Sequence, residues 1–101
     1  IMKLNKYNLS VNQEVYCCGL ELHRAGRIYA NVPPTKMIYN GSKFETEKGK
    51  KYSGTYFEVF DNLEECNQAY NRLIKDTTEF CQKQIESFQQ TILKLNNEIT
   101  Y

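Results

Sequence analysis

Apolar and polar residues alternate at two different periods along this chain, one in each half. From Glu14 to His23 every second residue falls on one apolar face, which is the period of a β-strand. From Cys81 onward the apolar residues are spaced 4, 3, 4, 3 and 4 apart, which is a helical heptad pattern. Both prolines and all five glycines lie at or before Gly54. The pattern therefore predicts one α+β domain over residues 1–101, with a β-rich part (3–60) and a helical part (61–101).

The first strands follow from this alternation. Residues 14–23 form one strand, with even-numbered side chains on one face and odd-numbered ones on the other. A turn at 24–26 leads to a strand over 27–32. The residues of that strand expected to point inward are Ile28, Ala30 and Val32. Pro33-Pro34 is predicted to interrupt pairing, because proline cannot donate a backbone hydrogen bond. Residues 35–39 then resume as a strand.

The second half of the β-rich part is organised by turn residues. Asn40-Gly41 predicts a two-residue type I′ hairpin turn, after which residues 42–46 return antiparallel. A solvated loop at 47–51 leads to a last strand over 52–60. Four or five short strands over about residues 13–60 predict a small antiparallel sheet or an SH3-like barrel.

The helical part opens with a capping signal. Asp61 is followed three residues later by Glu64, which is the spacing of a capping box. The pattern predicts either one helix over about 62–98 or two near-continuous helices that bend at Asp76. The absence of glycine and proline favours near-continuity. The apolar stripe expected to pack on the sheet consists of Leu63, Cys66, Tyr70 and Leu73.

A narrower apolar stripe follows in the last part of the helix, and we call it the seam. Its members are Cys81, Ile85, Phe88, Ile92, Leu95 and Ile99. Nearly every other position there is polar, whereas a helix that lies on a globular core shows a broader apolar face. The seam therefore predicts a homo-oligomer joined through coiled-coil pairing. The alternative is that this segment folds back onto the sheet of its own chain.

Charge is distributed unevenly between the two parts. Up to Phe60 there are nine Lys/Arg and five Asp/Glu, and from Asp61 onward there are four and seven. Cations and aromatic rings interleave in the β-rich part, and the candidate contact face consists of Arg24, Arg27, Tyr29, Lys36, Tyr39, Lys43, Phe44 and Tyr52. Such a face suits an unknown protein partner, single-stranded nucleic acid or a nucleotide. Alternatively, these charges solvate loops or pair with the acidic helix of a neighbouring copy.

The residues that carry most enzyme chemistry are scarce. Cys17 and Cys18 are adjacent and point to opposite faces of a strand, while Cys66 and Cys81 fall among apolar helical positions, so we expect four reduced thiols. His23 is the single histidine, and no phosphate loop, nucleophile elbow or metal-ligand cluster is present. We therefore predict a non-enzymatic protein with no catalytic residue, metal or cofactor.

The chain also lacks the apolar runs that membranes require. No run approaches the roughly 20 apolar residues of a spanning helix, and the first residues show no segment of secretory type. We predict a cytoplasmic protein with no membrane partner.

One local phrase adds a context. Residues 56–65 (YFEVFDNLEE) encode a strand that leads into a capped helix. This phrase resembles small proteins of Gram-positive phages and other mobile elements, several of which inhibit or sequester host factors. The resemblance implies an accessory protein that inhibits or sequesters a host defence factor, and it assigns no functional residue. The alternative function is binding of single-stranded nucleic acid or sequestration of a nucleotide.

Overall fold

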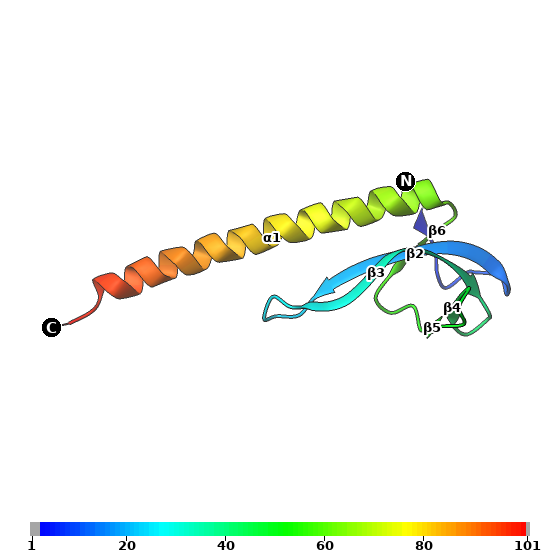
Figure 1. The fold of residues 1–101 in the computed structure, drawn as a ribbon, viewed down its shortest axis with the longest axis horizontal. Coiled ribbons are helices and arrows are strands. Elements are labelled where there is room, and N and C mark those ends of the chain that lie inside the picture. Colours follow the sequence, from blue (N-terminus) through cyan, green and yellow to red (C-terminus); the bar gives the residue numbers. More distant parts are fainter. Residues whose placement is uncertain (1–2, 101) are drawn as a thin grey trace.

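The computed structural model describes residues 3–100, which form one antiparallel sheet and one long helix (Figure 1). The elements are β1 (Lys3–Leu4), β2 (Gln13–Leu22), β3 (Ile28–Tyr39), β4 (Phe44–Thr46), β5 (Lys51–Tyr52), β6 (Glu58–Phe60) and α1 (Leu63–Asn97). The molecule measures 69 × 23 × 23 Å because α1 extends well past the sheet. The predicted α+β fold, a small antiparallel sheet followed by a long helix, is confirmed. Within the described residues, no helix is both long enough and apolar enough to cross a bilayer.

The sheet is curled but open. Its strands run in the order β1-β6-β2-β3-β4-β5, so that β1 and β5 are edges and the SH3-like barrel does not close. Lys6 fastens the segment after β1 to the loop before β6, since its Nζ donates to the carbonyl oxygens of Gly54 at 2.8 Å and Phe57 at 3.1 Å. Of the two predicted alternatives, the structure is therefore the open antiparallel sheet.

The two prolines do not divide β3. The strand runs from Ile28 to Tyr39, and its pairing with β2 shifts register between Cys17 and Gly19. Cys17 pairs with Thr35 and Gly19 with Val32, so β3 holds one extra residue at the prolines. A bulge leaves one residue without a ladder partner, and this is where proline's missing N–H does least harm. Pairing is therefore interrupted at the prolines, as predicted, but the strand itself continues through them.

The predicted turn at Asn40-Gly41 is displaced by one residue. The backbone N–H of Asn40 donates to the carbonyl of Lys43, which puts Gly41 and Ser42 at the centre. Gly41 has a φ of +97°, as the first central residue of a type II′ turn requires. The Asn40 side chain accepts from the N–H groups of Ser42 and Lys43 at 3.0 and 2.8 Å. Asn40 thus stabilises the turn through its side-chain oxygen.

The single strand predicted over 52–60 is instead two strands at separate places in the sheet. β5 pairs with β4 at one edge, and β6 lies between β1 and β2. Residues 53–57 connect them and include Gly54 at φ +92°. Phe57 and Val59 join the cluster inside the curled sheet, whereas Phe60 packs with Cys18 and Cys66 on the helix side.

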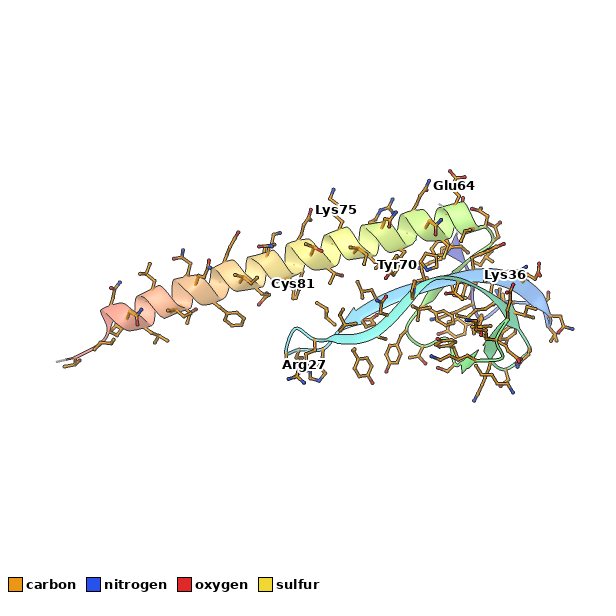
Figure 2. The ribbon with its side chains drawn as sticks, in the orientation of Figure 1. Arg27, Lys36, Glu64, Tyr70, Lys75 and Cys81 are labelled. Carbon is orange, nitrogen blue, oxygen red and sulfur yellow. The ribbon has the colours of Figure 1, made fainter. Side chains whose placement is uncertain are left out.

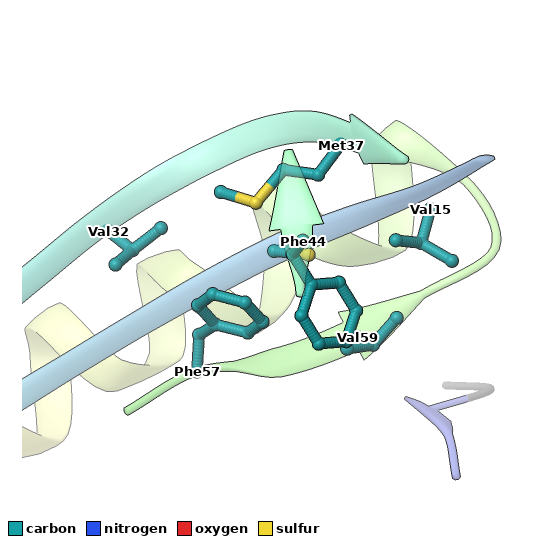
Figure 3. Close-up of a cluster of buried hydrophobic side chains, with 7 residues drawn as sticks. Val15, Val32, Met37, Phe44, Phe57 and Val59 are labelled. Carbon is teal, nitrogen blue, oxygen red and sulfur yellow. The ribbon is translucent and has the colours of Figure 1, made fainter. Parts of the chain in front are cut away.

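Side chains on the two faces of β2 enter two different clusters. Odd-numbered positions join the cluster inside the curled sheet, whose buried members are Val15, Cys17, Val32, Met37, Phe44, Phe57 and Val59 (Figure 3). Even-numbered positions face the helix, where Cys18 packs with Phe60 and Cys66. The alternation read from the sequence therefore assigns both faces correctly.

The helix is continuous from Leu63 to Asn97. Its N-cap is Asn62, one residue later than predicted, and the Asn62 side chain accepts from the Glu65 N–H at 2.9 Å. Beside Asp76, where the alternative placed a bend, Thr78 donates its hydroxyl to the Ile74 carbonyl within the helix at 2.8 Å. The predicted bend at Asp76 is therefore absent.

Candidate interaction surfaces

The helix has one apolar stripe that the sheet covers only at the N-terminal end. Cys66 is buried, and the members that follow it are half-buried as far as Cys81: Tyr70, Leu73, Thr77 and Cys81. Tyr70 also donates its hydroxyl to the Asn31 side chain on β3 at 2.7 Å. Leu63 is an exception, since it is 46% exposed at the helix start. The predicted packing stripe is thus real but begins one turn later.

Beyond Cys81 the same stripe continues without cover (Figure 2). The exposed fractions of the seam side chains are 49% for Ile85, 64% for Phe88, 58% for Ile92, 62% for Leu95 and 54% for Ile99. The helix ends at Asn97, so Ile99 lies just outside it. The alternative in which this segment folds back onto its own sheet does not occur.

The positions that flank the seam are almost uncharged. In heptad terms isoleucines occupy the a positions and Phe88 and Leu95 the d positions. The flanking e and g positions hold Gln82, Gln84, Gln89, Thr91, Asn96 and Glu98. Only the last of these is charged. A second copy can therefore approach without opposing like charges, whereas partners selected by charge need charged flanks.

The eight residues of the predicted contact face do not share one surface. Phe44 is 3% exposed and packs against Phe57 inside the sheet, with ring centroids 5.0 Å apart. Tyr39 and Tyr52 are half-buried against the same cluster. The two-residue turn was the signal that could have placed Phe44 in the core, because it pairs β3 with β4 so that Phe44 lies on the same face as Tyr39. Its assignment to a contact face is corrected, because a buried ring contacts no partner.

The cations of that face are also separated. Lys36 pairs with Glu14 at 3.1 Å, and this carboxylate raises the pKa of Lys36. Arg24, Arg27 and Tyr29 lie at one end of the β2–β3 hairpin, whereas Lys43 follows the other end of β3. A strand of this length spans roughly 40 Å. The hairpin end and the Lys43 turn are therefore two separate places.

The hairpin carries an aromatic cluster that the sequence pattern did not reveal. Tyr29 and Tyr56 meet edge to face with ring centroids 5.1 Å apart. The Tyr56 hydroxyl donates to that of Tyr29 at 3.2 Å, and this contact raises the pKa of Tyr56. His23 stacks on Tyr29 at 6.5 Å. Since 27 positions separate the two tyrosines, only the chain crossing over β2 brings them together.

A groove of about 350 Å³ lies beside Lys36. Its charged lining residues are Glu14, Lys36, Glu45 and Glu47. Three carboxylates face one cation that is already paired, so this groove does not suit an anionic ligand such as a nucleotide.

The buried thiols have a structural setting. Burial raises the pKa of Cys17 to about 12, and the contact with Cys18, together with burial, raises the pKa of Cys66. The Cys18 thiol donates to the Cys66 carbonyl at 3.5 Å, which ties β2 to the helix. The raised pKa values keep the Cys17 and Cys66 thiols protonated and poorly nucleophilic. Across residues 3–100, no group of three or more His, Cys, Asp or Glu side chains is arranged to hold a metal ion.

Comparison with known proteins adds no relative. No protein-family model matches the chain, and neither the curated proteins nor the solved structures gave a match. The functional argument therefore depends on the surfaces described above.

Proposed function

We propose that this chain is a non-enzymatic interaction protein that pairs with a second copy through the seam of its helix. The observation that supports the proposal is the exposed apolar stripe from Ile85 to Leu95, on a helix that extends past its own sheet. Heptad spacing and uncharged flanks make another copy of the same helix a fitting partner. The pair would display the two β-rich parts to a further protein.

The expected affinity of this pairing is modest. Full burial of a large aliphatic or aromatic side chain contributes about 1.5–3 kcal/mol, and these side chains still expose about half of their surface or more. Ile85, Phe88, Ile92 and Leu95 from two copies thus contribute on the order of 10 kcal/mol, against which several kcal/mol of association entropy must be set. We expect dissociation constants in the micromolar range or weaker.

Two adjacent substitutions test the proposal. Ile92→Asp puts a carboxylate into the seam, whereas Leu93→Asp makes the same kind of change outside it, 100° further around the helix. Leu93 is 57% exposed, close to the 58% of Ile92, so the two are matched in a single chain. Multi-angle light scattering over a range of concentrations measures the mass of each protein.

The wild type and Leu93→Asp should shift from monomer to dimer as concentration rises, while Ile92→Asp stays monomeric. Circular dichroism confirms that both variants keep their helix. A wild type that stays monomeric at the highest concentration, or two variants that behave alike, would contradict the pairing.

For the further protein partner, the hairpin offers the best contact surface. Tyr29 and Tyr56 are 59% and 42% exposed and already packed together, with Arg27 close by. Tyrosine and arginine are the residues enriched at binding hot spots. We favour this over nucleic-acid binding because the cations and rings are dispersed over the sheet. Inhibition of a host factor, the role implied by the phage-like phrase, stays a prediction. Loss of a host-factor interaction in Tyr29→Ala would support it.

A further inference from the structure

The seam and the sheet lie on the same side of α1. Cys66 and Tyr70 contact the sheet, and the following stripe members, from Leu73 to Leu95, recur every three or four residues along a straight helix (Figure 1). At 100° per residue, the sheet-covered positions (66, 70, 73 and 77) and the seam positions (85, 88, 92 and 95) are centred about 50° apart around the helix, so both sets lie on the same side of α1. A partner helix must therefore approach from the side that the sheet already occupies.

Because the seam and the sheet lie on the same side of α1, two copies cannot easily pair their helices in parallel. Both sheets would then lie at the same end, between the two helices. Packed helices lie about 8–10 Å apart, and a helix–sheet–sheet–helix stack needs roughly 30 Å if each layer takes about 10 Å. From Ile85 back to Tyr70 the helix rises only about 22 Å. The axes would have to diverge by roughly 20 Å over that length, which separates the seam.

We propose, building on the self-pairing of the previous section, that the two helices run antiparallel, with the twofold axis between them at the level of Gln90 along the helix. In this register Ile85 packs against the partner's Leu95, and Phe88 packs against the partner's Ile92. Symmetry repeats both contacts, as an isologous interface requires. At the flanking positions Gln89 lies beside the partner's Gln89 and Thr91 beside the partner's Thr91. Gln84 lies beside the partner's Glu98. The sheets lie at opposite ends and do not collide.

The end of the β2–β3 hairpin completes this interface. Leu22 pairs with Ile28, which puts both on the face of the hairpin that points toward α1. Ile28 is 63% exposed, contrary to its predicted inward position. Figure 2 shows the neighbouring Arg27 at about the same level along the molecule as Cys81. Antiparallel pairing brings the partner's last helical turn to this level, where it covers Ile28.

Thiol crosslinking of the full chain tests the orientation. In a Cys81→Ser background, Ile85→Cys and Leu95→Cys are purified separately, mixed and treated with a short bis-maleimide. The three remaining cysteines are fully buried and do not compete. The mixture should yield a crosslinked dimer that contains one copy of each variant. Ile85→Cys alone should yield none, because the two copies of residue 85 lie roughly 15 Å apart along the axis. Leu93→Cys is the control outside the seam.

Crosslinking of Ile85→Cys with itself would overturn the antiparallel orientation. So would a mixture that light scattering shows to be dimeric but that gives no crosslink. A wild type that is monomeric by scattering would instead remove the underlying self-pairing, so the two failures are distinguishable. Ile28→Asp should raise the concentration needed for dimerisation about tenfold, while Ile38→Asp at the other end of β3 leaves it unchanged. Equal effects of these two variants would overturn the hairpin contact.

Discussion

Gly19 lies where two segments of the chain approach closely. It is in the middle of β2 on the inner face, and residues 56 and 57 cross directly over it. A Cβ added at this position would lie 2.8 Å from the Cα and 2.9 Å from the Cβ of Phe57. The carbonyl oxygen of Tyr56 would be nearer still. Ordinary contact begins at 3.4 Å, so relief of the Phe57 contacts alone requires a shift of about 0.6 Å, and the Tyr56 oxygen requires a larger one. Phe57 anchors that segment in the core, where its ring meets those of Phe44 and Tyr52.

Gly19→Ala should therefore destabilise the protein strongly. The obstructing atoms include backbone, which cannot rotate away as a flexible side chain can, so we expect a loss near the upper end of overpacking costs, about 3 kcal/mol. For a domain of this size that lowers the melting temperature by about 12–24 °C. The same displacement separates Tyr56 from Tyr29.

Thermal unfolding followed by circular dichroism, at one fixed protein concentration, measures the effect. Gly49→Ala is the matched control: its φ is +83°, and nothing lies within 4 Å of the added Cβ. That variant should lose only about 1–2 kcal/mol from the left-handed backbone conformation. If Gly19→Ala melts within 2 °C of the wild type, or no lower than Gly49→Ala, the close approach does not limit the fold.

Two further predictions concern the core. Phe44→Ala should lower the free energy of unfolding in urea by about 3–5 kcal/mol, because it leaves a cavity in the inner cluster. Lys43→Ala should change it by less than about 0.5 kcal/mol. Equal changes in the two variants would contradict the burial of Phe44 in the core. The raised pKa of Cys17, about 12 against an ordinary 9.0, predicts alkaline sensitivity. Unfolded chains lose this proton above pH 9 while folded ones keep it, so stability is full below pH 9 and then falls by up to about 1.4 kcal/mol per pH unit. Cys17→Ala should flatten that decline in urea midpoints measured between about pH 8 and pH 10, and an unchanged slope would refute the assignment.

Local periodicity predicted the parts of this fold that depend on neighbouring residues. The two faces of β2, the turn at 24–26 and the long helix are all confirmed, because a period of two or a heptad directly states which side chains share a face. The end of the helix near Asn97 also agrees with the predicted boundary.

Features that depend on distant segments were predicted less well. Pro33 and Pro34 looked like a strand end, and only the pairing with β2 shows that a bulge absorbs them. The contact between Tyr29 and Tyr56 requires the crossing over Gly19, which no local pattern announces. Likewise, the pairing of Lys36 with Glu14 depends on the register of β2 against β3. For this reason, the residues of the candidate contact face do not lie together in the structure.

The two edge strands of the open sheet, β1 (Lys3–Leu4) and β5 (Lys51–Tyr52), are each only two residues long. The β2–β3 hairpin extends past them, and there residues 19–22 and 28–36 have a strand partner on one side only. Unpaired strand edges are the usual template for runaway aggregation, and brevity together with lysine is how natural sheets prevent it. Stacking of copies through β1 or β5 is thereby discouraged, so any edge-to-edge contact would have to use the outer sides of the β2–β3 hairpin.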